Sequence, residues 1–193
     1  MRAEYENVLD DHLGQIHFTY VNTWDELLPA HWHEHLEIIY VLGGEITASI
    51  NDVSYELKKG DIFLVNSNDI HYTHTHEDAR YYLLQIPPVH LERISAKWKG
   101  LKFQELIRSK SADACVHGEQ LENVQGKGLV EMRENRKSTN RADDLYDQLR
   151  DVFRKIAGFY EEKKEGYHLL VLSAVYRLLY FLYTEGIRSE EDT

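Results

Sequence analysis

The stretch HWHEHLEIIYVLGGEI, His31–Ile46, governs the interpretation of the whole sequence. Three histidines and two glutamates stand at its start, and a run rich in Ile, Val and Tyr follows and ends at Gly43-Gly44. This run predicts a buried strand over Leu36–Leu42. Alternate side chains of a strand share a face, so one face carries several potential ligands at one end of an apolar row. The row consists of His31, His33, His35, Glu37, Ile39 and Val41.

The composition is that of a soluble globular protein with one sizeable core. The chain has 193 residues, of which 42% are hydrophobic and 28% are charged. It contains no apolar run long enough to span a membrane and no signal peptide pattern, so we expect a cytoplasmic protein without membrane association. The single cysteine, Cys115, fits a reducing compartment and has no neighbours that suggest a nucleophile. A net charge of −11 argues against direct binding to nucleic acid.

Short strands separated by Gly, Asn and Asp turns are predicted on both sides of the opening stretch. Pro29 is expected to keep residues 22–30 out of regular structure. The predicted strands are residues 15–22, 36–42, 45–50, 53–57, 62–65, 70–75 and 80–86. This spacing is typical of an antiparallel barrel or sandwich. Several of these strands are apolar on both faces, which requires a second layer outside them.

The C-terminal part of the chain supplies helices for that layer. Apolar residues recur at helical spacing between Leu145 and Tyr160, and Asn140 is a suitable N-cap for this helix. A second helix over Tyr167–Glu185 is apolar almost all round, so we expect one of its faces to contact a second copy of the chain. The predicted dimerisation residues are Leu169, Leu172, Tyr176, Leu178, Leu179 and Leu182. The predicted organisation is a barrel (1–88), a connecting helix and loop segment (89–139) and a helical hairpin (140–193).

Two spacings resemble the motifs of the cupin family. His31-x-His33 followed by Glu37 and Gly44 resembles the first cupin motif. The spacing from Gly60 to His71 resembles the second, although Asn66 and Asn68 stand where cupins usually carry Pro and Gly. With the apolar hairpin, the pattern is similar to the N-terminal sensor domain of AraC-family transcriptional regulators. The resemblance implies a cupin-like antiparallel β-barrel of jelly-roll type followed by an α-helical hairpin.

The same resemblance implies a ligand-sensing and dimerisation domain. Such a domain binds a small-molecule effector in the barrel, for instance a sugar or an aromatic compound. It acts on DNA only through a further module, which would begin at about Ile187–Thr193, where this chain stops. An alternative is a stand-alone metal-dependent cupin enzyme, a dioxygenase or an isomerase. The long apolar hairpin favours the sensor, because an isolated cupin enzyme does not need it.

Two interpretations of the site stay open from the sequence. A shell of three imidazoles and one carboxylate suits a divalent transition metal such as Zn, Ni or Fe. The same side chains could instead line an effector pocket. In both cases the residues are His31, His33, Glu37 and His71. His74 and His76 have the opposite parity on their strand, so we expect them to point away from His71 into solvent.

Overall fold

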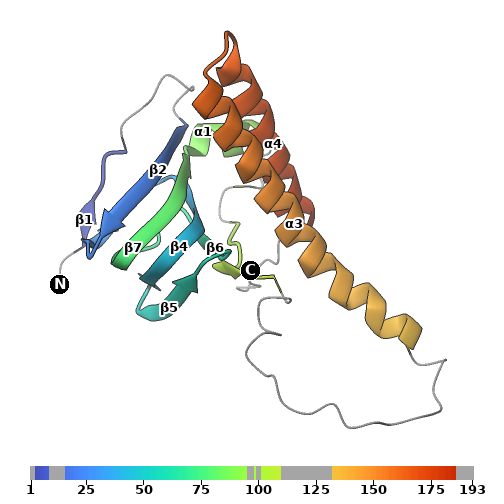
Figure 1. Cartoon of the computed structure of the whole chain (residues 1–193), viewed down its shortest axis with the longest axis horizontal. Helices are drawn as coiled ribbons and strands as arrows, with labels where there is room; N and C mark the ends of the chain where they lie inside the picture. Colours follow the sequence, from blue (N-terminus) through green and yellow to red (C-terminus); the bar gives the residue numbers. More distant parts are fainter. Residues whose placement is uncertain (1–2, 9–15, 95–97, 99–100, 110–131, 186–193) are drawn as a thin grey trace.

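The computed structural model describes residues 3–8, 16–94, 98, 101–109 and 132–185, and of 132–143 only the backbone. A curved β-sheet is covered on one side by a long helical hairpin (Figure 1). The strands are β1 (Glu4–Tyr5), β2 (His17–Trp24), β3 (Leu27–Trp32), β4 (Leu36–Ile50), β5 (Val53–Lys58), β6 (Ile62–Val65), β7 (His71–Ile86) and β8 (Leu106–Ile107). The helices are α1 (Pro88–Ile94), α3 (Met132–Glu162) and α4 (Tyr167–Glu185). No helix in these ranges is long and apolar enough to cross a membrane.

The two long strands, β4 and β7, pair antiparallel along their whole length and form the centre of the sheet. The first half of β4 pairs with β6 and its second half with β5. In the same way, β7 pairs first with β3 and then with β2. Each long strand therefore belongs to both halves of the sheet, which confirms the predicted antiparallel barrel of jelly-roll type.

A bulge at Gly43-Gly44 divides β4 into these two halves. The register with β7 shifts on both sides of Gly43. Before the bulge Ile39 and Val41 lie in the barrel core, and after it Ile46, Ala48 and Ile50 lie there. The parity of the inward side chains changes because a bulge inserts one extra residue into the strand.

Three sequence predictions about strand boundaries were wrong. The Gly43-Gly44 pair was predicted to be a turn, but it is a bend within one strand. Residues 76–79 were predicted to separate two strands, but they continue β7. Pro29 lies inside β3, where a register shift between Leu28 and His31 accommodates its missing N–H group.

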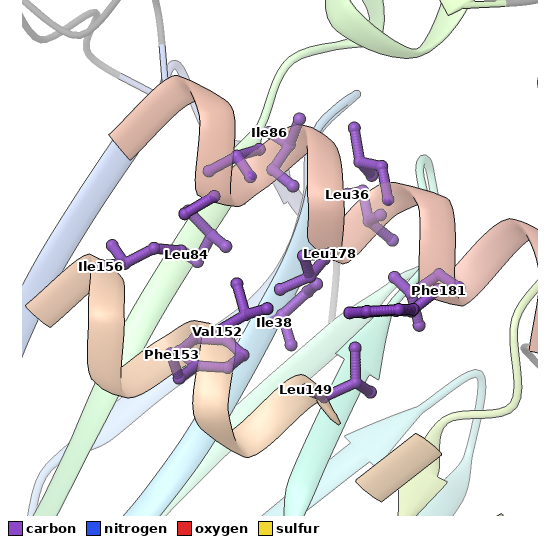
Figure 2. Packing of buried hydrophobic residues seen from close by; sticks show 14 of the residues in the cluster. Leu36, Ile38, Leu84, Ile86, Leu149, Val152, Phe153, Ile156, Leu178 and Phe181 are labelled. Carbon is purple, nitrogen blue, oxygen red and sulfur yellow. The ribbon is translucent and has the colours of Figure 1, made fainter. Parts of the chain in front are cut away.

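The helical hairpin packs on the outer face of the sheet, and its residues share one hydrophobic cluster with the strands (Figure 2). Even-numbered residues of β4, such as Leu36 and Ile38, meet Leu149 and Phe153 of α3 and Leu178 of α4 in this cluster. The α4 helix has the predicted bounds. The α3 helix begins at Met132, eight residues before the predicted N-cap at Asn140, so that prediction was wrong. Cys115 and much of the predicted connecting segment lie outside the described residues.

The fold also changes which residues of α4 are available to a partner chain. Leu178, Leu179 and Leu182 are fully buried within the chain, and Leu172 is partly buried against the same cluster. The prediction that Leu178, Leu179 and Leu182 form the interface was therefore wrong, because the sheet and α3 already cover them. The large hydrophobic side chains that α4 leaves exposed are Leu169, Leu170, Tyr176 and Tyr180.

Candidate metal site in the barrel

Three histidines converge at one end of the barrel. His31 in β3 is the register partner of His71 in β7, and His33 lies in the short connector between β3 and β4. The ring centroid of His71 lies 4.1 Å from that of His31 and 5.0 Å from that of His33. One ligand atom from each ring lies within 4.8 Å of the others. A metal bound at about 2.1 Å would bring such atoms to about 3.4 Å apart, which small side-chain rotations can achieve.

The connector that carries His33 is fixed by the turn before β7. The amide of Asn68 donates to the carbonyl oxygen of His33 at 2.9 Å. Asn68 has φ of 66°, a left-handed conformation that Asn tolerates and in which cupins usually use Gly. The side-chain amide of Asn66 exchanges two hydrogen bonds with the backbone of Phe103. These two departures from the cupin motif therefore keep the site in place and attach a further segment to it.

Each of the three imidazoles is held by its Nδ1 atom. His31, His33 and His71 place Nδ1 at 2.8, 3.2 and 3.0 Å from the carbonyl oxygens of Pro29, His35 and Asp69. A carbonyl oxygen only accepts, so every Nδ1 must carry a proton. The Nε2 atoms then point toward one another, and hydrogen bonds of this kind are how proteins orient metal-binding histidines.

Glu37 provides the negative charge beside these rings. Its Oε2 lies 3.0 Å from Nε2 of His33 and accepts a hydrogen bond of 2.8 Å from Nε2 of Gln85. Burial alone would raise the pKa of Glu37, but the hydrogen bond from His33 and the charges of His71 and His33 lower it to about 2. Burial opposes a charge on His33 as well, yet Glu37 raises its pKa. Both ring nitrogens of His33 face acceptors, the carbonyl oxygen of His35 and the carboxylate of Glu37, and this geometry favours the charged form of the ring.

The pKa of His71 shifts in the opposite direction to that of His33. Burial lowers its pKa, and the nearby charge of Glu37 only partly offsets this. Its buried Nε2 atom has no hydrogen-bond partner among the described residues, and the nearest carboxylate oxygen, Oε1 of Glu37, lies 3.9 Å away. A buried polar atom without a partner is costly, and a cation between these rings would satisfy it. The donor set thus fits a divalent metal.

The structure brings together all four residues that the sequence proposed and adds two more. Gln85 is the register partner of Glu37, and its amide is a polar interruption in the apolar end of β7. Oε2 of Glu6 lies 3.6 Å from Nε2 of His31 and 3.8 Å from Nε2 of His33. No sequence motif pointed to Glu6, which directly follows β1. The ring centroids of His35 and His33 lie 5.9 Å apart, but His35 does not belong to the group of three histidines that converge in the barrel.

Among the described residues, the cavity at this site in the barrel is small. A cavity of about 40 Å³ opens among the ligands and is lined further by residues such as Thr73 and Tyr81. Burial and the charges of Glu37 and Glu26 raise the pKa of Tyr81 to about 12, so its hydroxyl stays protonated. The cavity has room for an ion and one or two water-sized groups, whereas pockets for organic ligands measure about 300–1,000 Å³.

The fold and the histidine–carboxylate cluster define a barrel of the cupin type. A profile of the family described as the AraC-like ligand binding domain matches residues 14–179. The chain belongs to this family, as its sequence predicted.

Over 63 residues it is 30% identical to the uncharacterized HTH-type transcriptional regulator YdeC of Bacillus subtilis (strain 168). The match covers 32% of this chain and 22% of that protein, so the chain spans about a fifth of the length of this relative.

Similar solved structures include proteins of several bacteria. An RmlC-like cupin from Shewanella frigidimarina aligns with a TM-score of 0.36 and 20% identity, over 37% of this chain and 66% of that chain. KdgF from Halomonas sp. aligns with a TM-score of 0.35 and 23% identity, over 37% and 68% of the two chains. A predicted oxalate decarboxylase from Thermotoga maritima aligns with a TM-score of 0.34 and 23% identity, over 36% and 64%.

Proposed function

We propose that this chain is the ligand-sensing domain of an AraC-type transcriptional regulator whose barrel holds a divalent transition metal. His31, His33 and His71 bind the metal through Nε2, and Glu37 adds a carboxylate. The observation that carries this proposal is the backbone anchoring of all three Nδ1 atoms, which directs three Nε2 atoms to one point. Imidazole and carboxylate together suit Zn²⁺, Ni²⁺ or Fe²⁺.

The metal supplies a positive charge at the bottom of the cavity, to which an oxygen atom of an effector can bind. The chain's own residues orient the rings, neutralise the charge and exclude bulk water. Because the cavity measures only about 40 Å³, we infer an effector with a small oxygen-bearing group rather than a whole sugar or aromatic ring inside the barrel.

We propose a regulatory rather than a catalytic role because of the hairpin. The α3 and α4 helices bury the outer face of the sheet, and α4 still leaves Leu169, Leu170, Tyr176 and Tyr180 exposed along one side. Apolar patches of this kind are commonly covered in a symmetric dimer. We therefore propose a homodimer through this face, with DNA bound by a further module of the full regulator. A chain with a net charge of −11 does not favour direct contact with DNA.

Calorimetric titration of chelator-treated protein with Zn²⁺ tests the metal site. We expect the barrel to contribute one tight binding event, and we expect this event to be lost in His33→Ala and in His31→Ala. The exposed His168 provides the matched control, because His168→Ala removes an imidazole without touching the barrel. Circular dichroism verifies that each variant is folded. If both barrel variants keep the same number of tight events as the wild type, the proposal is contradicted.

A further inference from the structure

A second group of potential metal ligands lies where β7 meets the turn between β2 and β3. His74 and His76 are two residues apart on β7 and share a face, with ring centroids 4.3 Å apart. Asp25, in the turn, places Oδ1 at 2.9 Å from Nε2 of His74. One ligand atom from each of the three side chains lies within 4.8 Å of the others.

This group lies on the opposite side of the sheet from the barrel site. Along this part of β7, His71, Thr73 and Thr75 are buried in the barrel. The alternation of a strand therefore turns His74 and His76 outward, as the sequence predicted. Both are only partly exposed, and the side chain of His74 is 36% accessible.

The turn that carries Asp25 is fixed to β7 between the two histidines. Thr75 donates its amide to the carbonyl oxygen of Glu26 at 2.9 Å, and the amide of Glu26 donates to Oγ1 of Thr75 at 3.0 Å. The hydroxyl of Thr75 lies 3.2 Å from the same carbonyl oxygen. Because Thr75 stands between His74 and His76 in sequence, these bonds hold Asp25 beside both rings. The group is therefore arranged before any ion binds.

A carboxylate also orients His76. Nε2 of His76 lies 2.8 Å from Oγ1 of Thr47, which lies 3.2 Å from both carboxylate oxygens of Glu56. The carboxylate only accepts, so Thr47 donates its proton to Glu56 and accepts from Nε2–H of His76. The other ring nitrogen of His76, Nδ1, then carries a lone pair that can bind a metal. Metal-binding histidines are commonly oriented in this way, by a hydrogen bond from their second ring nitrogen.

We propose that Asp25, His74 and His76 form a second binding site for a divalent transition metal, separate from the site in the barrel. Two imidazoles and one carboxylate suit Zn²⁺, Ni²⁺ or Cu²⁺ and leave positions for water. A metal here links the β2–β3 turn to β7 on the outer surface of the domain.

The test uses Zn²⁺ titrations in which each site is removed in turn. In His33→Ala, which lacks the barrel site, we expect one remaining event. That event weakens at least about tenfold when His74→Ala or Asp25→Asn is added. Asn is chosen at position 25 because φ there is 46°, which Asn tolerates. His33→Ala with His168→Ala is the matched control and keeps the event.

The two sites give distinguishable outcomes. If His33→Ala protein binds Zn²⁺ no more tightly than the variant that also carries His74→Ala, the outer site is refuted and the barrel site stands. If the barrel variants leave the number of tight events unchanged while His74→Ala removes one, the barrel proposal fails and the outer site stands. Ni²⁺ broadening of NMR signals from the β2–β3 turn, seen in His33→Ala and absent from its His74→Ala derivative, locates the outer ion directly.

Discussion

At the scale of single residues, the barrel site contains a buried carboxylate, that of Glu37. Glu37 is 5% exposed, and Gln85 and His33 hold its carboxylate through hydrogen bonds of 2.8 and 3.0 Å. A buried carboxylate is favourable only when donors or cations surround it. In the metal-free protein the hydrogen bonds from His33 and Gln85 meet this requirement, and in the metal-bound protein the ion adds to them.

The pH dependence of stability tests this role of Glu37. The pKa of Glu37 falls from an ordinary value of 4.5 to about 2 on folding. Its stabilising contribution is therefore complete above about pH 4.5 and is lost as the pH falls toward 2, an effect of about 3 kcal/mol. In the presence of a chelator, the free energy of unfolding of wild type should approach that of Glu37→Gln as the pH is lowered from 5. Urea titrations at several pH values measure the difference, and a difference independent of pH would contradict this account.

The four principal site residues were predictable from spacing, but their partners were not. His31, His33 and Glu37 lie within seven positions, and His71 follows in the second motif. Gln85 and Glu6 come from distant positions and reach the site only through the pairing of β7 with β4 and of β1 with β3. Likewise, parity placed His74 on the outer face, yet only the fold brings Asp25 to it.

At the scale of elements, the bend of β4 depends on Gly44. Its φ is +73°, and an added Cβ would lie 2.5 Å from the carbonyl oxygen of Asp78 and 2.6 Å from Cα of Ala79. Both contacts are with the backbone of β7, which cannot move without breaking the central strand pair. The need for glycine at this close approach also explains the wrong prediction of a turn. A Gly-Gly pair in an apolar run is typical of a hairpin turn, and the sequence alone does not distinguish the two.

We expect Gly44→Ala to destabilise the fold by at least about 2 kcal/mol, because it adds backbone strain to a steric clash. Gly158 in α3 is the control, since an added Cβ there meets no atom within 4 Å. Gly158→Ala should stabilise the helix by up to about 1 kcal/mol. Chemical denaturation of both variants measures these changes, and equal effects of the two substitutions would show that the close approach at Gly44 is unimportant.

At the scale of the whole molecule, the hairpin has two different faces. One face buries Leu178, Leu179 and Leu182 against the sheet and α3. The other exposes Leu169 and Tyr180, at 63% and 61%. The fold class and the helix α4 could be predicted from apolar periodicity, but the division between inner and outer faces could not. A helix that is apolar all round carries no signal for which side meets its own chain.

We expect the wild-type protein to scatter light as a dimer. The double variant Leu169→Glu/Tyr180→Glu should be monomeric, because four buried carboxylates would be placed in the symmetric interface. Lys155→Glu on the exposed side of α3 is the control and should stay dimeric. A double variant with the mass of the wild type would exclude this face as the interface.

The barrel metal is the central claim, and anomalous diffraction from crystals grown with Zn²⁺ tests it most directly. We predict a strong anomalous peak in the barrel, about 2.0–2.1 Å from Nε2 of His31, His33 and His71, with Glu37 turned toward it. Crystals of His74→Ala should keep this peak. The claim is contradicted if no anomalous peak lies among these three rings in the wild-type protein.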